Sequence, residues 1–366
     1  MLMPIRPVQG VALHARVRRA GTTITVPSGG AVRGRVLNAI GEPIDGGPTL
    51  DRARLVPMMS SPPNPMRRQF VDTVMPLGIP VIDGLMTVGR GQRVGIAAPA
   101  GVGKSTLLAS IAEQVSADLV VLALIGERGR EVRPFVEKVQ ERGGERATVV
   151  VSTSDQPALM RLKAAFTATA IAEAAAAEGA NVVLMMDSVT RFARALREIG
   201  LAAGEAPGRQ GFPASVFESL PKLFERAGNG ERGSITAFYT ILVTGDDLTE
   251  PVTDEAISLL DGHIVLSREL ANRGQYPAID VLHSVSRLMN DLVDARHQEI
   301  AKKFRAILGL YEKNYDRISL GKYQPPTDED RDLFGRVKAA LGFLRDRHPK
   351  RSIEETRSIL EKVCFG

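Results

Sequence analysis

The middle of the chain alternates between short runs of apolar residues and longer stretches of mixed polarity. The apolar runs lie at 94–98, 119–125, 147–152, 181–186, 234–243 and 263–266. Such runs are typical of strands that are buried on both faces. Between two of them, the Ala-rich stretch from Ala158 to Glu178 is a strong helix former that ends at Gly179. Buried strands separated by helices predict an α/β fold, with a mostly parallel sheet covered by helices.

The pattern changes at both ends of the chain. Residues 8–51 contain short alternating runs broken by glycine and proline, which predicts β-structure with too few strands for a separate barrel. A proline-rich link, SSPPNPMRRQ, follows at 60–69. After Asn290 apolar residues recur at helical spacing, and Ser352 with Glu355 predicts a capping box. We therefore expect a β-rich segment and linker at 1–58, a central domain at 59–290 and a small helical domain at 291–366.

The first apolar run leads into a glycine-bearing turn and then a helix-forming stretch, in the sequence RVGIAAPAGVGKSTLLAS. A phosphate-binding loop requires that order, because Gly101 and Gly103 allow backbone N–H groups to surround phosphate oxygens. Lys104 is expected to contact the β- and γ-phosphates of a nucleotide, and the Ser105 hydroxyl to bind Mg²⁺. The first position of the eight-residue motif is Ala98 instead of glycine, so the strict pattern fails there. The strand before the turn and the helix after it favour nucleotide binding.

Acidic residues follow two of the other predicted strands. Asp187 stands at the tip of an apolar run, where a carboxylate can act on the Mg²⁺ side of a nucleotide. Glu127 follows another run, and the carboxyl ends of parallel strands open toward a ligand, so this carboxylate could polarise an attacking water. A surface glutamate in the charged loop ERGRE is the other interpretation of Glu127, and the residues alone leave both open. The chain has 47 Lys and Arg residues, and composition alone does not indicate that Arg287 differs in role from the others.

The composition and net charge add little to the predicted fold and the candidate nucleotide site. The 366 residues have a formal net charge of +5 that is spread along the chain, which permits binding to an acidic surface without requiring it. The single cysteine, Cys364, cannot form an internal disulfide, and the five histidines show no metal-ligand spacing. The start of the sequence has no secretory signal, and no apolar run approaches the ~20 residues that span a bilayer. The sequence is therefore interpreted as that of a soluble intracellular protein.

From about Val32 onward the sequence resembles the ATPases of type III protein secretion, which are similar to the catalytic β subunit of rotary ATP synthases. The matching stretches are GRVLNAIGEPIDG, AGVGKST, IGERGREV, LMMDSVTRFA, GFPASVFESLPKLFERAG, GSITAFYTILVTGDD, LDGHIVLSREL and YPAIDVLHSVSRLMN. Their number and collinear order make the resemblance specific. TGDDLTEP and AIDVLHSVSRLMN look more like the virulence-injectisome branch than the flagellar export branch. The resemblance implies a RecA-like P-loop NTPase core that hydrolyses ATP with Mg²⁺ as a six-membered ring.

The resemblance also implies which residues hold the nucleotide. The positions that match the nucleotide-binding loop are Ala100, Gly101, Val102, Gly103, Lys104, Ser105 and Thr106. Tyr276 matches an aromatic ring that lies against adenine in the family. Tyr323, in GKYQ, is expected to be a second such ring.

Further positions match residues that act in hydrolysis, together with Lys104. Glu127 in IGER matches the general-base carboxylate, and Arg128 matches its neighbour, which faces the γ-phosphate. Asp187 matches the carboxylate on the Mg²⁺ side, where Ser105 is the expected metal ligand. Arg287 in SVSR matches the arginine finger that is given to the adjacent subunit.

By the same resemblance, ATP hydrolysis powers type III secretion through chaperone release and unfolding of exported proteins. The implied partners are further copies of the chain, chaperone–effector complexes received by the C-terminal helical domain, and stalk and stator proteins of the secretion apparatus. The implied location is the cytoplasm, peripherally at the cytoplasmic face of the inner membrane. The family usually opens with a complete β-barrel that holds the hexamer together. Only its last part is recognised here, so ring assembly is expected to be weakened.

Three alternative functions remain. One is a flagellar protein export ATPase, which the same motifs fit. Another is a non-catalytic ring subunit, but in such subunits the glutamate of IGER is replaced, and Glu127 is present here. The third is a ring-shaped RNA helicase, which needs aromatic platforms for stacking bases. Residues 8–51 contain no Trp, Tyr or Phe, so specific nucleic-acid binding is not expected.

Overall fold

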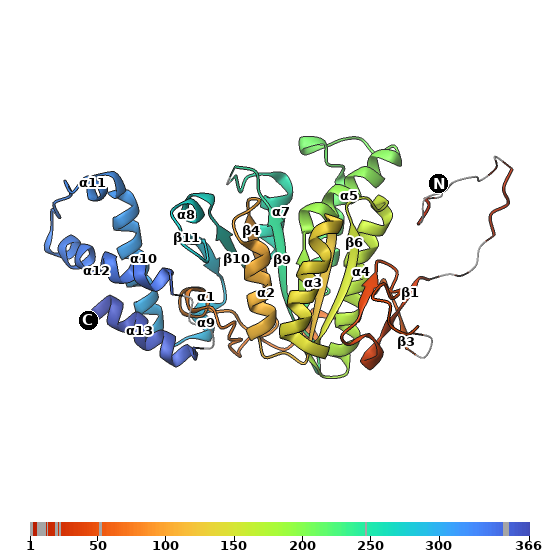
Figure 1. Cartoon of the computed structure of the whole chain (residues 1–366), viewed down its shortest axis with the longest axis horizontal. Helices are drawn as coiled ribbons and strands as arrows, with labels where there is room; N and C mark the ends of the chain where they lie inside the picture. The colour runs from red at the N-terminus through yellow and green to blue at the C-terminus, as the bar shows by residue number, and fades with distance from the viewer. Residues whose placement is uncertain are drawn as a thin grey trace. The chain divides into compact units, whose positions relative to one another are not determined.

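The computed structural model describes residues 3–5, 12, 14–18, 21, 23–50, 53–245, 247–346 and 351–366 (Figure 1). The chain divides into two units, which are described one at a time. The first unit comprises Met1–Val71, Arg90–Ala97 and Ala117–Leu260. The second comprises Asp72–Gly89, Ala98–Ser116 and Asp261–Gly366. Among the described residues, no helix is both long and apolar enough to span a membrane.

The first unit is built on a mostly parallel sheet. Its strands are β2 (Val36–Asn38), β4 (Arg93–Ala98), β5 (Leu119–Glu127), β6 (Ala147–Thr153), β7 (Asn181–Asp187) and β9 (Ser234–Leu242). They lie in the order β4-β9-β7-β5-β6-β2, and the pairs β9–β7, β7–β5, β5–β6 and β6–β2 are parallel. A short strand, β8 (Gly228–Asn229), pairs antiparallel with β9. The predicted parallel sheet is confirmed, and five of the six predicted runs coincide with its strands. The sixth run, 263–266, forms a strand of the second unit that pairs antiparallel with its neighbour.

Helices cover this sheet because its strands are apolar on both faces. Every residue of β5 except the last is buried, which only a strand covered on both sides can achieve. The helices of this unit are α3 (Gly129–Gly143), α4 (Ala158–Ala177), α5 (Val189–Ala202), α6 (Ala214–Phe224) and α7 (Pro251–Leu259). Helix α4 is the predicted Ala-rich helix, and it packs on β5, β6 and β7 and against α5. The central strands are thereby held rigidly, and the residues at their ends acquire fixed positions.

Two antiparallel strands from the N-terminal part, β1 (Thr25–Ser28) and β3 (Arg54–Pro57), pair with each other and pack on α4. The short 3-10 helices of this unit are η1 (Gly29–Val32), η2 (Pro65–Arg67), η3 (Gly144–Arg146) and η4 (Arg209–Gly211). Strand β2, although it lies in the same N-terminal segment, extends the parallel sheet at its edge by pairing with β6. The N-terminal segment therefore contributes to the sheet of this unit, and the domain boundary expected at residue 58 stays a prediction.

A buried ion pair lies where α4 meets the segment after α6. The Arg226 side chain is 1 % exposed and forms two hydrogen bonds with the Glu173 carboxylate, at 2.8 and 2.6 Å. The Ser60 hydroxyl donates to the same carboxylate at 2.7 Å. The guanidinium also lies 5.8 Å from the centre of the Phe166 ring. Removing one partner of such a pair leaves a buried charge without compensation.

We expect Glu173→Ala to lower the free energy of unfolding by about 3–5 kcal/mol, because Arg226 would keep its charge in a buried place. Urea denaturation followed by circular dichroism measures this. Glu178→Ala is the matched control on the same helix end, because its pair with Arg54 is exposed on both sides and should contribute less than about 1 kcal/mol. Equal effects of the two substitutions would contradict the argument.

The second unit contains a hairpin and most of the C-terminal helices. The hairpin consists of β10 (Gly262–Leu266) and β11 (Ile279–Ser286), which pair antiparallel. Its helices are α1 (Pro80–Leu85), α2 (Lys104–Gln114), α8 (Arg268–Asn272), α9 (Met289–Leu292), α10 (Ala295–Lys313), α11 (Tyr315–Ser319), α12 (Asp328–Leu344) and α13 (Ile353–Phe365). Helices α10, α12 and α13 pack on one another, with Phe304 and Phe343 in edge-to-face contact at 5.5 Å.

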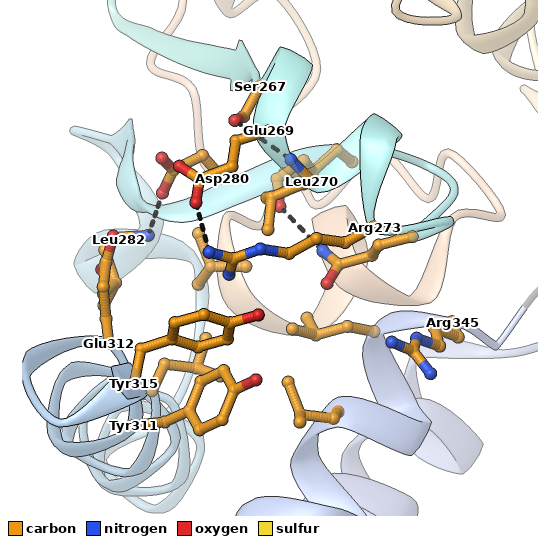
Figure 2. Close-up of a pocket in the computed structure, with 16 residues that line it drawn as sticks. Ser267, Glu269, Leu270, Arg273, Asp280, Leu282, Tyr311, Glu312, Tyr315 and Arg345 are labelled. Atoms are coloured by element: carbon orange, nitrogen blue, oxygen red, sulfur yellow. Dashed lines mark hydrogen bonds and ion pairs between the residues drawn. The ribbon is translucent and has the colours of Figure 1, made fainter. Parts of the chain in front are cut away.

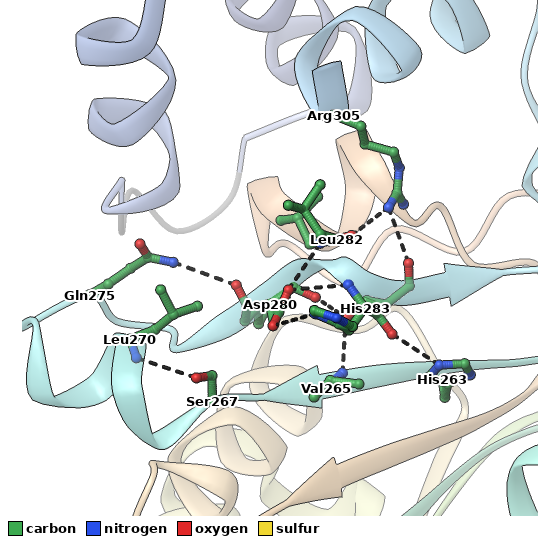
Figure 3. Close-up of polar contacts among 12 residues, drawn as sticks. His263, Val265, Ser267, Leu270, Gln275, Asp280, Leu282, His283 and Arg305 are labelled. Atoms are coloured by element: carbon green, nitrogen blue, oxygen red, sulfur yellow. Dashed lines mark hydrogen bonds and ion pairs between the residues drawn. The ribbon is translucent and has the colours of Figure 1, made fainter. Parts of the chain in front are cut away.

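The helical character predicted after Asn290 is confirmed in this unit. Ser352 and Glu355 form the predicted capping box at the start of α13. Side chains of the hairpin are joined by a polar network that Figure 3 shows: the His263 ring bonds the His283 carbonyl at 3.0 Å, and His283 pairs with Asp280 at 2.8 Å. Arg305 of α10 donates to the carbonyls of Val281 and Ser284, so the helix is tied to β11.

Candidate functional site

The residues singled out by the sequence fall into two groups, one in each unit. The phosphate loop, Tyr276 and Arg287 belong to the second unit, whereas Glu127 and Asp187 belong to the first. Each group is described by itself.

The phosphate loop connects β4 to α2. Gly101 and Gly103 have φ values of +84° and +95°, a left-handed conformation that side-chain-bearing residues rarely adopt. Gly103 caps α2, and Lys104 is the first residue of the helix. Ser105 and Thr106 follow on the exposed first turn. Because a glycine cap has no side chain to accept hydrogen bonds, the first backbone N–H groups of α2 can donate to an anion, as at phosphate-binding helix ends.

The remaining residues of the loop have distinct environments. Ala100 is exposed, whereas Val102 is 2 % exposed and anchors the loop in the apolar interior of the second unit. The loop is therefore fixed at Val102 and open to solvent on either side. This combination of a fixed backbone and accessible N–H groups suits a loop that binds phosphate without rearranging.

A cavity of about 440 Å³ lies beside the phosphate loop. Its lining residues are Gly78, Ile79, Pro80, Val102, Gly103, Thr106, Leu107, Ser110, Gln114, Leu266, Tyr276, Pro277, Ala278 and Asp346. The Tyr276 ring lies 3.8 Å from the place that a Cβ on Gly103 would occupy, so the ring is directly next to the loop. A mostly apolar cavity of this size with an aromatic wall suits a purine base. We call it the base cavity.

The second predicted ring, Tyr323, does not line the base cavity. It packs on Phe334 with the ring centres 5.1 Å apart, in the segment between α11 and α12. Its role against adenine stays a prediction.

A second cavity in the same unit, of about 270 Å³, differs in character (Figure 2). There the Arg273 guanidinium lies 3.9 Å from the centre of the Tyr315 ring and forms an ion pair with Glu269. Since Arg273 covers this ring and no phosphate-loop residue lines the cavity, it does not have the features of a nucleotide site. The base cavity is therefore the better candidate.

In the first unit, Glu127 is placed by an irregularity at the end of β5. The register of β5 against β6 shifts between Ile125 and Glu127, and Gly126 at that point has φ +67°. A Cβ on Gly126 would lie 3.0 Å from the Arg191 side chain. The bulge thus brings Glu127 and Arg191 together: Nη2 of Arg191 lies 3.4 Å from Oε2 of Glu127, and the two side chains are 24 % and 13 % exposed. The Glu127 carboxylate is therefore oriented by a neighbouring guanidinium.

Asp187 ends β7 and is 2 % exposed. Its Oδ1 accepts a hydrogen bond from the Thr240 hydroxyl on the neighbouring strand β9, at 2.8 Å. Ser188 caps α5 by accepting from the Arg191 backbone N–H. The ends of β5, β7 and β9 in this unit therefore present Glu127, Asp187 and Thr240, with Arg191 on the first turn of α5. Thr240 was not predicted from the sequence as a partner of Asp187, although a threonine near the end of a mostly apolar strand could have indicated it.

The two predicted arginines are both on the surface of their units. The Arg128 side chain is 65 % exposed and pairs with Glu131 at 3.1 Å. Arg287 directly follows β11, is exposed, and its backbone N–H is held by the Asp261 carbonyl at 3.0 Å. Neither position is buried within its own unit, which is compatible with a role toward a ligand or another subunit.

Two family models match the sequence. Residues 78–286 match the ATP synthase alpha/beta family, nucleotide-binding domain. Residues 293–362 match the T3SS EscN ATPase C-terminal domain. Every site residue named above lies within one of the two matches except Arg287, which falls in the short gap between them, near the start of the predicted helical domain.

Curated relatives come from both branches of type III export. The chain is 51% identical over 333 residues to the flagellum-specific ATP synthase of Bacillus subtilis, covering 91% of this chain and 76% of the relative. It is 47% identical over 366 residues to the type 3 secretion system ATPase of Xanthomonas euvesicatoria, covering 99% and 83%. Similar identities to both kinds of protein agree with the resemblance read from the motifs.

Solved structures give the same result. The chain is similar to the assembled ATPase EscN of the enteropathogenic Escherichia coli type III secretion system, with a TM-score of 0.94 and 44% identity, over 99% of this chain and 88% of that one. It is also similar to EscN in complex with its central stalk EscO, with a TM-score of 0.90 and 44% identity, over the same shares of the two chains.

Proposed function

The chain belongs to the ATP synthase alpha/beta family, and from that premise we propose that it hydrolyses Mg²⁺–ATP as a subunit of a six-membered ring that powers type III protein export. The observation that carries the proposal is the phosphate loop, with its two left-handed glycines and open helix end, next to a base cavity walled by Tyr276. The relatives are ATPases of flagellar and type 3 secretion systems, and one similar structure is an assembled ATPase.

The phosphate loop would bind the triphosphate. Backbone N–H groups from Gly101 to Thr106 donate to phosphate oxygens, and Lys104 offsets the charge of the β- and γ-phosphates. Gly103 allows the backbone to approach the phosphates closely, since it carries no Cβ. Tyr276 stacks on the adenine, so base and phosphates are bound by adjoining parts of the second unit.

The chemistry of two residues suits a Mg²⁺ ion. Ser105 of the second unit carries a hydroxyl and Asp187 of the first carries a carboxylate, the kinds of oxygen ligand that Mg²⁺ prefers. Among the described residues there is no cluster of three or more His, Cys, Asp or Glu side chains that could hold a metal. When bound, the ion offsets charge that develops on the phosphates. Thr240 fixes the orientation of the Asp187 carboxylate.

Glu127 would act as the general base. We propose that its carboxylate orients the attacking water and accepts a proton from it, while the neighbouring Arg191 holds the carboxylate in position. Arg128 would then contribute positive charge toward the γ-phosphate, once its exposed pair with Glu131 exchanges for the ligand. The presence of this glutamate supports hydrolysis over mere nucleotide binding.

We also propose which proteins bind the chain. Copies of the chain form the ring, and a stalk protein is a further partner, as it is for the EscN complex. Chaperone–effector complexes would be received by the C-terminal helices α10 to α13. The ring would also bind stator proteins and lie peripherally at the cytoplasmic face of the inner membrane.

Phosphate release from ATP tests the activity directly. We expect the purified protein to hydrolyse ATP with Mg²⁺ and to lose at least about 10²-fold of that rate after EDTA, because the phosphate charges would lack their counter-ion. Lys104→Ala serves as the background, since it removes the only side-chain cation of the phosphate loop. A wild-type rate no higher than that of Lys104→Ala, in rings shown to be assembled, would overturn the proposal.

A further inference from the structure

A carboxylate is buried behind the base cavity. Asp83 lies in the short helix α1 and is 2 % exposed. Its Oδ1 accepts a hydrogen bond from the Leu77 backbone N–H at 2.8 Å, and the backbone N–H groups of Gly78 and Ile79 donate to the same carboxylate. Backbone amides that donate to the ionised form offset part of the cost of burying it.

Two of the three amides that Asp83 binds belong to the wall of the base cavity. Gly78 and Ile79 both line it, together with Tyr276 and residues of α2. Gly78 has φ +68°, and a Cβ there would lie 2.0 Å from Oε1 of Gln114. The segment 77–79 therefore fits closely against the helix that begins at the phosphate loop, and a small shift of this segment would change the shape of the cavity.

We propose that Asp83 is a positioning residue for the nucleotide base: its carboxylate holds the segment 77–79 in the position that the base requires. The inference rests on the proposed function, because it assigns the base of ATP to this cavity. It also makes a separable claim, namely that Asp83 acts on the base and not on the phosphates. Lys104 and the loop N–H groups, which would bind the phosphates, lie on other segments of the unit.

Helix α1 is held from its other side by the C-terminal helices. Nε2 of His297 on α10 bonds the Gly84 carbonyl at 2.8 Å, and Arg305 donates to the Leu85 carbonyl at 3.0 Å. Figure 3 shows Arg305 extending from α10 to the carbonyls of β11. A Cβ on Gly84 would lie 2.4 Å from Leu360 of α13. These contacts do not involve the Asp83 side chain, so α1 should stay in place when that side chain is changed.

Burial raises the pKa of Asp83 from its usual 3.8 to about 6, against the lowering effect of the three amides. Protonation places an O–H donor where backbone N–H donors converge, so the segment is then held less firmly. Two titratable or charged side chains of α10, His297 and Arg305, bond backbone carbonyls of α1 and not the Asp83 carboxylate. Thr356 and Leu360 of α13 lie next to Gly84 of α1, Gln114 of α2 lies next to Gly78, and Ser286 of β11 donates to the Thr87 carbonyl; none of these side chains titrates in this range.

The same pKa predicts that folding tolerates the loss of this charge. Because the folded-state pKa lies above the usual value, ionisation between about pH 4 and pH 6 lowers the free energy of unfolding. The neutral variant Asp83→Asn is therefore expected to have a urea midpoint at pH 7.5 no lower than that of wild type. In this variant the side-chain amide nitrogen is a hydrogen-bond donor that faces the backbone N–H groups of residues 77–79, so this segment should be held less firmly.

The experiment compares a ligand that has a base with one that has none. For Asp83→Asn we expect the KM for ATP to rise about tenfold, because that is the size of effect that losing a hydrogen bond to a charged group produces. The kcat should stay within about twofold of wild type. The inhibition constant of inorganic tripolyphosphate, which has no base, should be unchanged. Asp291→Asn, the same chemical change at an exposed position on α9, should alter neither constant.

A pH series gives a second measurement, which compares the wild-type protein with Asp83→Asn. The ratio of the KM for ATP to the inhibition constant of tripolyphosphate cancels the titration of the phosphates. We expect this ratio to rise severalfold between pH 7.5 and pH 5.5 in wild type and to stay flat in Asp83→Asn. Equal weakening of both ligands, or no change in either, would overturn the role of Asp83. A wild-type protein that hydrolyses no ATP would instead contradict the proposed function.

Discussion

Replacing Glu127 with glutamine is expected to slow ATP turnover by about 10²-fold or more while leaving the affinity for ATP close to that of wild type. Glutamine has the size of glutamate and can still accept one hydrogen bond, but it cannot take a proton from water at neutral pH. If Glu127 acts only in the chemical step, the loss appears in kcat and not in binding. The two are measured by phosphate release and by equilibrium binding of a fluorescent ATP analogue.

The geometry around Glu127 determines the control for this experiment. Because Arg191 lies 3.4 Å from the carboxylate, Glu127→Gln also removes an ion pair, and part of its effect could come from a displaced arginine. Glu137→Gln on α3 removes an exposed pair with Arg133 instead and should leave turnover within about twofold of wild type. Near-wild-type turnover of Glu127→Gln would exclude this residue from the mechanism, and a loss of ATP affinity equal to the loss in rate would assign it to binding.

The elements that could be predicted are those whose pattern of apolar and polar residues is clear within a few consecutive positions. The strands β5, β7 and β9 were predictable because both their faces are buried, so their sequences are continuously apolar. Strand β11 was not predicted, because its burial does not follow the polarity of its residues: Ser284 is buried, whereas Val285 is exposed. Helix α1 was missed as well, since six residues that begin with proline and contain Gly84 show no helical period.

The candidate site likewise has a part that could be predicted from the sequence and a part that could not. The phosphate loop could be predicted because its chemistry is written in consecutive residues, and Gly101 and Gly103 have the conformation that the motif requires. The contacts of Glu127 could not, because they depend on a bulge at Gly126 and on a helix that begins about sixty residues later along the chain. The same holds for Asp83, whose partners are backbone N–H groups that leave no trace in the pattern of side chains.

Mixing two inactive variants is expected to restore ATPase activity if Arg287 acts on the nucleotide of a neighbouring subunit. Lys104→Ala lacks the phosphate-loop cation, and Arg287→Ala lacks the finger, so each ring alone should be inactive. In mixed rings, a junction is intact where an Arg287→Ala subunit supplies the loop and a Lys104→Ala subunit supplies the arginine. The exposure of Arg287 at the end of β11, on a backbone held by the Asp261 carbonyl, is what makes such a contact feasible.

The amount of recovered activity distinguishes the mechanisms. Random mixing in equal parts leaves about one quarter of the junctions intact, so about a quarter of wild-type activity is expected if junctions work independently. Mixing Lys104→Ala with Arg317→Ala, which changes an exposed arginine on α11, leaves about half of the junctions intact and calibrates subunit exchange. A result near a quarter in the first mixture and near a half in the second supports a shared site. No recovery in the first mixture, with the second at half, would place Arg287 in the site of its own subunit or outside the mechanism.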